Sequence, residues 1–309
     1  MIRCPISSAA AVAVLVVGVS ELAFLSRTEL LTGLPVFQPT VDDATLVAKR
    51  RLLPRVTNEI LLIGDSSCTM GLDPAVFEAA GLGRPVNLGT LASFTMPGFA
   101  ALGVEALEYR PRAVVVSVLP RSFEMTEAQA REFDLLGRYL TAYGRQSPAY
   151  DLRPADRWSW FARKHRFNIF PPEFGGSFAA YAGKLDEWNG HYHERGTYAG
   201  AKPFEYKARF QPTEYCRIGL LQLADATRNR GVPLLFWWSP SPTDAVSAEY
   251  LTDASRYVDE FAAGAPDFIV LRPAPSWDPE NFGSVTHLTP TAAKSNSEEL
   301  AKYIHLNLN

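Results

Sequence analysis

Cysteine is scarce in this chain, with three residues in 309, which excludes a disulfide framework of the kind that stabilises small secreted domains. Cys68 and Cys216 lie outside the N-terminal segment; they form either a bridge in an oxidising compartment or, as we expect, two buried thiols. Neither sign of charge dominates, since 30 Lys and Arg stand against 33 Asp and Glu. The net charge of −3 leaves no global basic field, so we predict no nucleic-acid partner.

Hydrophobic residues make up 47% of the chain and charged residues 20%, enough to bury a full core. The N-terminal apolar run Ala9–Val19 follows Arg3 and is shorter than the roughly 20 residues that a membrane-spanning helix needs. Its length fits a signal-peptide core, but Gly18–Ser20 is a poor cleavage site and apolar residues resume after Glu21. We predict that residues 1–26 are an uncleaved membrane anchor, with a cleaved signal peptide as the alternative. Either way the remainder is exported, to the periplasm or the cell surface, or secreted after cleavage.

Residues 27–56 are mixed in composition and contain three prolines and the basic cluster Lys49–Arg51. They read as a stalk or linker with a helix near residues 42–53. We expect the basic cluster to form a solvated face.

From residue 57 to residue 309, short apolar runs alternate with helical segments. Strands are predicted at 59–63, 86–88, 113–119, 232–238 and 267–271, and helices at 75–80, 98–109, 213–230, 245–263 and 291–306. Such alternation predicts an α/β fold with a doubly wound, five-stranded parallel sheet. The run at 113–119 is apolar throughout, as expected of a strand covered on both faces.

The alternation breaks over residues 121–212, a segment too long for a simple connection. We predict an insertion with its own structure that sits over the carboxyl edge of the sheet as a lid or substrate wall. Arg121, Trp158 and Trp160 are the candidate wall residues, and the two tryptophans offer stacking surfaces for sugar rings. His191 and His193 in this segment invite a metal site, but no second cluster completes a coordination sphere, so we predict no metal and no cofactor.

The first predicted strand ends abruptly in Gly64–Asp65–Ser66. An open α/β sheet binds ligands at the carboxyl ends of its strands, so this turn presents a hydroxyl where chemistry would occur. Ser66 is therefore a candidate nucleophile, provided that a base lies beside it. The alternative is a strand that runs into an ordinary loop.

Two further segments follow in order: Asn87–Leu88–Gly89 after the second strand and His287 just before the last helix. Serine early, Asn-Leu-Gly next and histidine last resemble the SGNH (GDSL-type) hydrolase superfamily over residues 57–120 and 213–308. The resemblance is nearest to its membrane-anchored branch that acts on cell-envelope polymers, such as the alginate acetylation proteins and the D-alanyl transfer protein of teichoic acid synthesis. It implies that His287 is the base and that the N–H groups of Ser66 and Gly89 stabilise an oxyanion.

The chain departs from the family pattern at two positions. The usual asparagine after the third strand is absent, and Arg121 or Ser122 stands in that region. The aspartate expected three residues before the histidine is Ser284, a hydroxyl that can fix the imidazole tautomer but adds no charge. Asp278 or Glu280 of the same loop could supply the carboxylate instead.

The resemblance implies an exported serine acyl-esterase or O-acyltransferase that acts on an envelope glycan, together with a membrane protein that donates the acyl group. The missing aspartate and asparagine leave a second reading open, a non-catalytic module of the same fold that binds glycan or a membrane partner. A signalling domain of flavodoxin-like topology is a third interpretation. Such a domain would have several acidic residues at the end of the first strand, where this sequence has Asp65 alone.

Overall fold

The computed structural model describes residues 41–154, 178–192 and 209–308. Five apolar segments form one sheet in the order β2-β1-β3-β4-β6. They are β1 (Ile60–Gly64), β2 (Val86–Asn87), β3 (Ala113–Val118), β4 (Leu234–Trp238) and β6 (Phe268–Val270). Every neighbouring pair is parallel, so all five carboxyl ends lie at one edge. The predicted α/β class with a five-stranded parallel sheet is confirmed.

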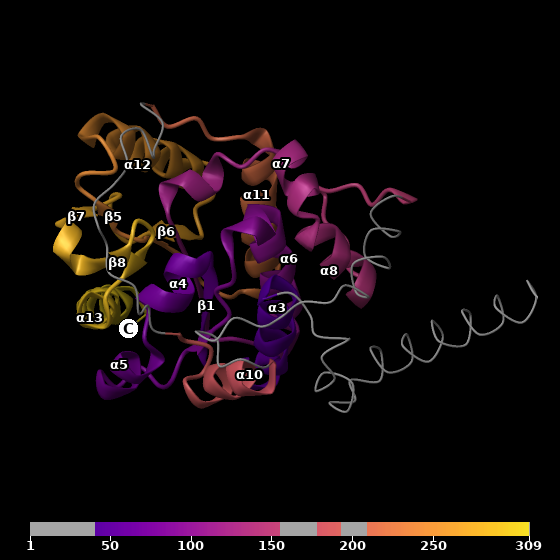
Figure 1. Ribbon diagram of the computed structural model, residues 1–309, viewed down its shortest axis with the longest axis horizontal. Coiled ribbons are helices and arrows are strands. Elements are labelled where there is room, and N and C mark those ends of the chain that lie inside the picture. Colours follow the sequence, from indigo (N-terminus) through magenta and orange to yellow (C-terminus); the bar gives the residue numbers. More distant parts are fainter. Residues whose placement is uncertain (1–40, 155–177, 193–208, 309) are drawn as a thin grey trace, which may run out of the picture.

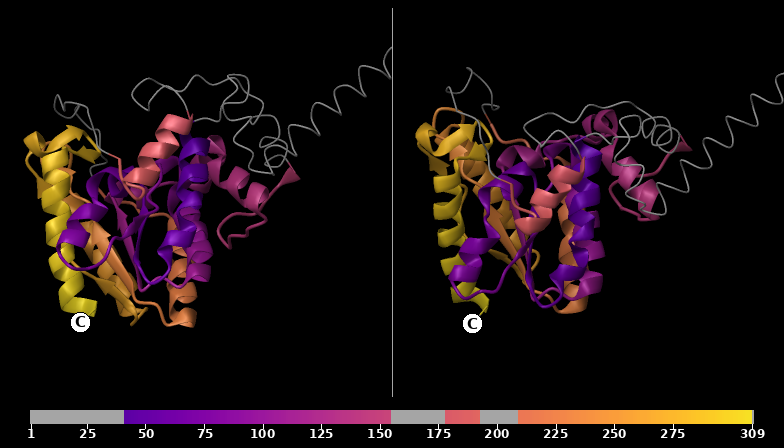
Figure 2. Two further views of the ribbon diagram at one scale, coloured as in Figure 1. Left: turned by 90° about the horizontal axis from the view of Figure 1, so that it is seen from below. Right: turned by 60° about the horizontal axis from the view of Figure 1, so that its bottom comes forward.

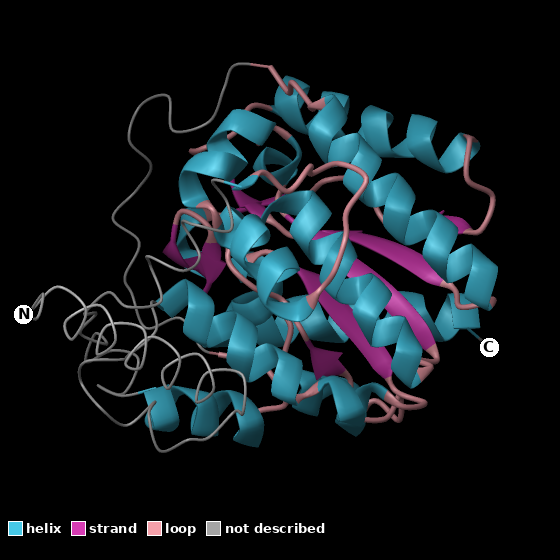
Figure 3. Ribbon diagram, turned by 90° about the vertical axis from the view of Figure 1, so that its right-hand side faces the viewer, coloured by secondary structure: helices cyan, strands magenta, loops and turns pink. Residues whose placement is uncertain are grey.

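Alternate side chains of β1 point to opposite faces of the sheet. Leu61 and Ile63 join a core with α6 (Thr95–Ala106), α11 (Glu214–Arg230) and α12 (Ala248–Ala263). Ile60 and Leu62 join a second core with α5 (Pro74–Ala79) and α13 (Pro290–Leu308). In Figure 1 the helices α5 and α13 lie on one side of β1 and the helices α6 and α11 on the other. Figures 2 and 3 show the strands enclosed between these two sets of helices. Burial on both faces is the reason that the strands are apolar throughout rather than alternating.

Short elements lie between these helices and strands. The 3₁₀ helices are η2 (Leu53–Val56), η3 (Ala92–Phe94), η4 (Leu107–Tyr109), η5 (Pro120–Phe123) and η7 (Pro279–Asn281). Beyond the main sheet, β5 (Ser241–Pro242) pairs in parallel with β7 (Ser276–Trp277), and β8 (Phe282–Ser284) forms a hairpin with β9 (His287–Leu288). The sequence indicated none of these four short strands.

The predicted insertion at 121–212 contains α7 (Glu127–Phe133), α8 (Leu135–Tyr143) and α10 (Phe178–Glu187) in its described part. Leu136 and Tyr139 of α8 belong to the same buried core as α6, and the Tyr139 ring packs edge-on against Phe94 at 5.1 Å. This part of the segment is therefore built into the domain. Trp158 and Trp160 lie outside the described residues.

The helix predicted near residues 42–53 is present, but residues 41–56 are part of the domain rather than a stalk. This stretch forms α3 (Val41–Arg51) and η2, and Thr45, Ala48 and Lys49 are buried against the domain. The basic cluster is also not a solvated face, because Lys49 is fully buried and Arg50 is ion-paired. Residues 27–40 and the predicted anchor at 1–26 lie outside the described residues.

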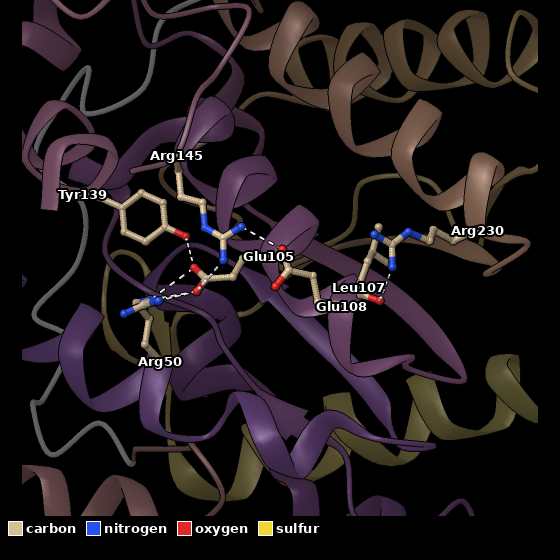
Figure 4. A network of polar contacts seen from close by, with 7 residues as sticks. All are labelled: Arg50, Glu105, Leu107, Glu108, Tyr139, Arg145 and Arg230. Atoms are coloured by element: carbon tan, nitrogen blue, oxygen red, sulfur yellow. Dashed lines mark hydrogen bonds and ion pairs between the residues drawn. The ribbon is translucent and has the colours of Figure 1, made fainter. Parts of the chain in front are cut away.

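A buried ion network fastens α3 and α8 to α6 (Figure 4). Glu105 of α6 is 2% exposed and accepts hydrogen bonds from Arg50 Nε at 3.1 and 3.2 Å and from Tyr139 OH at 2.5 Å. Arg145 Nη2 lies 3.1 Å from the same carboxylate. Burial alone would raise the pKa of Glu105, but the hydrogen bonds from Arg50 and Tyr139 hold the pKa below its usual value.

Both cysteines outside the N-terminal segment are free thiols. Cys68 and Cys216 are buried, and burial raises the pKa of each, to about 11 for Cys216. The expected pair of buried thiols is therefore confirmed.

The helices of the described ranges include none that is both long enough and apolar enough to cross a lipid bilayer.

Candidate active site

Ser66 is the first residue of α4 (Ser66–Gly71), a helix of six residues that the sequence did not predict. Asp65 is its N-cap, with an extended backbone and a carboxylate that accepts the N–H of Ser67 at 2.8 Å. The first N–H groups of a helix have no partner within it. Ser66 therefore stands half-buried between the end of β1 and the first turn of α4.

Asp65 ties together the carboxyl ends of three strands. It is 1% exposed and accepts hydrogen bonds from the Ser67 hydroxyl, from Leu119 N at 3.0 Å and from the Ser122 hydroxyl. The Ser67 oxygen lies 2.8 Å from the Ser239 hydroxyl at the end of β4. The contacts of Asp65 are those of a group that positions the backbone around Ser66.

The hairpin of β8 and β9 brings Ser284 beside His287. Its two-residue turn pairs Ser284 directly with His287 across the strands, so the two side chains lie on one face. Ser284 Oγ is 3.0 Å from His287 Nδ1. A spacing of three residues across a tight hairpin therefore places a hydroxyl at the position that the family pattern gives to a carboxylate.

His287 Nε2 lies 2.8 Å from Ser66 Oγ, although 221 residues separate them in the sequence. An Nε2 that accepts the Ser66 proton requires the tautomer with hydrogen on Nδ1, and that hydrogen can then be donated to Ser284. The tautomer is assigned from this network. The three side chains make a Ser–His–Ser relay at the carboxyl edge of the sheet.

Gly89 packs against α4 at Cys68 and Thr69, but its N–H is already engaged. The N–H donates to Asn87 Oδ1 at 2.9 Å, so this hydrogen is not available to an oxyanion in the arrangement seen. A Cβ on Gly89 would lie 2.7 Å from the backbone nitrogen of Thr69, so the absence of a side chain lets α4 approach β2. Within the described residues the Ser66 N–H has no hydrogen-bond acceptor, which leaves it as the available donor.

The remaining candidates are spread around the edge. Arg121 is exposed in η5, while the Ser122 hydroxyl is occupied by Asp65. Asp278 and Glu280 are exposed beside η7. The structure brings Ser66, Ser284 and His287 into contact.

Two buried asparagines hold α4 in place, and sequence reasoning gave neither a role. Asn87 Nδ2 donates to the carbonyls of Cys68 and Leu72, each at 2.9 Å. Asn296 of α13 donates to Gly71 O at 3.0 Å and accepts from Trp237 Nε1 at 3.2 Å. Asn296 lies four residues before Leu300, on the apolar face of the last helix. A polar residue on this face is the feature of the sequence that could have indicated a buried hydrogen-bonding role.

Of the two histidines considered for a metal site, His191 is 1% exposed, and His193 is outside the described residues. Over residues 41–154, 178–192 and 209–308, no group of three metal-binding side chains is present.

Comparison of the chain with protein-family models, with curated proteins and with solved structures gave no match. The resemblance to the SGNH superfamily therefore depends on the three sequence segments.

Proposed function

We propose that this protein is an exported, SGNH-like serine enzyme that hydrolyses or transfers acyl groups, O-acetyl in the first instance, on a cell-envelope glycan. The observation that carries the proposal is the 2.8 Å contact between Ser66 Oγ and His287 Nε2. A serine needs an adjacent base to become nucleophilic, and a histidine suits neutral pH.

In the proposed reaction, Ser66 Oγ attacks the acyl carbonyl while His287 Nε2 takes the hydroxyl proton. The Ser66 N–H stabilises the oxyanion of the tetrahedral intermediate. His287 then protonates the leaving alcohol oxygen as its bond to carbon breaks, which leaves an acyl group on Ser66. A water molecule or an acceptor hydroxyl attacks this ester while His287 removes its proton. His287 then returns that proton to Ser66 Oγ as the bond between Ser66 and the acyl group breaks, which releases the acid or the acylated acceptor and restores the free serine.

Water as the second nucleophile makes the protein a hydrolase, whereas a glycan hydroxyl makes it a transferase. The preference for transfer rests on the resemblance and on the predicted membrane anchor. The membrane protein proposed as acyl donor rests on the same two grounds. Incubation with an acyl donor and an oligosaccharide would separate the two outcomes, because free acetate reports hydrolysis and an acetylated oligosaccharide reports transfer.

A non-catalytic glycan-binding or partner-binding module of the same fold is the second candidate. Two observations favour it: the Gly89 N–H is occupied by Asn87, and a neutral hydroxyl, Ser284, stands at His287 Nδ1. Both would weaken stabilisation of charge in a transition state.

A fluorophosphonate probe separates the two candidates, since it labels activated serines. We expect labelling of the wild-type protein at Ser66, located by peptide mass mapping, and no labelling of Ser66→Ala. His287→Gln should slow labelling by about 10²- to 10⁴-fold because the base is lost.

Ser295→Ala is the matched control, because Ser295 is an exposed serine on α13. It should label like the wild type. An unlabelled wild-type protein, or labelling that persists in Ser66→Ala, would overturn the enzyme proposal and leave the binding module.

A further inference from the structure

Lys49 of α3 is fully buried beside the candidate active site. Its Nζ donates to Asn87 O at 2.9 Å and to Gly190 O, and it lies 3.5 Å from Thr69 Oγ1. One ammonium group therefore joins α3 to α4, to the end of β2 and to the segment after α10.

The surroundings of Lys49 are unusual for a buried cation. Lysine is almost never fully buried unless it is paired with an anion. Its described acceptors are two carbonyls and a hydroxyl, all neutral. Burial lowers the pKa of Lys49 to about 7. A buried charge without a counter-ion lowers the stability of the folded protein. A role in the candidate active site therefore explains the presence of Lys49 better than a contribution to stability does.

Lys49 also meets the residues that hold the nucleophile helix. Asn87, whose carbonyl accepts from Lys49, uses its side chain to bind two carbonyls of α4 and the N–H of Gly89. Gly190 packs so closely that a Cβ on it would lie 1.8 Å from Asn87 O, and its φ is +94°. The Asn87 carbonyl thus accepts a hydrogen bond from Lys49 and is also in close contact with Gly190.

We propose that Lys49 is a positioning residue of the active site, whose ammonium group fixes the end of β2 against α4 and so sets the place of Ser66 relative to His287. This inference rests on the proposed serine chemistry, and it names a group that does not touch the substrate.

The first test measures positioning and reactivity together. Lys49→Met keeps the apolar stem and removes the donors, whereas Lys49→Gln keeps two N–H donors without the charge. In Lys49→Met we expect faster amide hydrogen exchange at residues 66–72 and 85–90. We also expect fluorophosphonate labelling per folded molecule to slow about 10- to 100-fold, because a small displacement of a nucleophile has an effect of this size. The amide exchange rate and the labelling rate of Lys49→Gln should lie between those of the wild type and of Lys49→Met. If Lys49→Met does not fold, Lys49→Gln is compared with the wild type instead.

Arg230→Met is the matched control. Arg230 also donates to a backbone carbonyl, that of Leu107 at 3.0 Å, at the amino end of β4 (Figure 4). The Arg230→Met variant should change neither the amide hydrogen exchange of residues 66–72 nor the rate of fluorophosphonate labelling. Unchanged exchange or unchanged labelling in Lys49→Met overturns the proposal, while absence of labelling in the wild type overturns the serine chemistry instead.

The second test uses pH. Cys68 on α4 is the ionisable group that acts on the charge of Lys49. The other ionisable groups on the surrounding elements are Asp42, Asp43, Arg50 and Arg51 on α3, Asp65 at the start of α4, Tyr181, Lys184, Asp186 and Glu187 on α10, and His191 and Tyr192 after α10. A neutral amine has fewer and weaker donors than an ammonium group. The ratio of wild-type to Lys49→Gln labelling rates should therefore fall as pH rises through about 7. A ratio that stays flat between pH 6 and 9 contradicts a role for the ammonium group.

Discussion

Ser284 places a hydroxyl at His287 Nδ1, at 3.0 Å. The hydroxyl accepts one hydrogen bond and so selects the tautomer in which Nε2 faces Ser66. It adds no negative charge to balance the imidazolium that forms during attack. The relay is therefore well oriented but weakly stabilised electrostatically.

Ser284→Ala should slow fluorophosphonate labelling of Ser66 about 5- to 10-fold, because one hydrogen bond of about 1 kcal/mol that fixes the imidazole is lost. The folded structure should be retained, because Ser284 is only half-buried. Pseudo-first-order labelling rates at a fixed probe concentration measure the effect. If Asp278→Asn slows the reaction and Ser284→Ala does not, the exposed carboxylate is the orienting group and our assignment is wrong.

The residues that could be predicted from the sequence are those that lie next to a recognisable strand or helix. Ser66 follows an apolar strand, and His287 precedes the last helix. Lys49 was missed because it was read with Arg50 and Arg51 as one solvated cluster. On a helix these three neighbours point in different directions, and the spacing from Thr45 to Lys49 places the lysine on the buried stripe.

At the scale of elements, α4 is held by contacts with other elements rather than by its own length. Six residues are too few for a stable isolated helix. Asn87 from β2 and Asn296 from α13 bind its last carbonyls. Since α13 directly follows the strand with His287, Asn296 links the helix of the nucleophile to the helix that follows the base.

Asn296→Ala should lower the free energy of unfolding by about 2 to 4 kcal/mol, because buried polar groups of Trp237, Arg272 and Gly71 lose their partner. It should also slow labelling of Ser66 in molecules that remain folded. Urea unfolding and probe kinetics at low denaturant give the two quantities.

Asn307→Ala on the same helix is the comparison, since the Asn307 side chain is exposed and binds only Tyr303 O. We expect a change within about 0.5 kcal/mol. If both variants lost the same free energy of unfolding, the contribution of Asn296 to stability would be no larger than the difference in helix propensity between asparagine and alanine.

The elements themselves were predicted more fully than their connections. Five strands and the long helices follow from apolar runs and caps, such as Thr213 and Gly231 at the two ends of α11. The helix α4 was not predicted, since Ser66–Gly71 carries no apolar periodicity and depends on tertiary partners. The hairpin of β8 and β9 is too short to have a pattern of its own.

At the scale of the whole molecule, the network around Glu105 attaches α3 and the described part of the insertion to α6, one of the helices that cover the sheet. Arg50 comes from α3, Tyr139 and Arg145 from the region of α8, and Glu105 from α6. The boundaries predicted from composition, at residues 57 and 121, therefore do not separate independent bodies in the described part of the chain.

Glu105→Gln should destabilise the protein by about 3 to 5 kcal/mol, because it leaves two cations beside a neutral amide in a buried place. Wild-type Glu105 has a lowered pKa, so its contribution is present above the unfolded-state pKa and is lost as pH falls through the folded-state value. The difference in unfolding free energy between wild type and variant should thus shrink on acidification.

Urea unfolding of both proteins at a series of pH values measures this difference. Labelling of Ser66 per folded molecule should stay unchanged, because the network does not contact the relay. A difference that is constant from neutral to acidic pH would contradict the assigned linkage.

The relay joins residues 66 and 287, so no shorter stretch of chain contains both halves of it. During synthesis the nucleophile emerges some 220 residues ahead of its base. A nascent polypeptide halted anywhere before the β8–β9 hairpin holds an ordinary, unreactive alcohol. If the proposed serine chemistry holds, reactivity toward esters begins only after the β8–β9 hairpin has been synthesised and has docked beside Ser66.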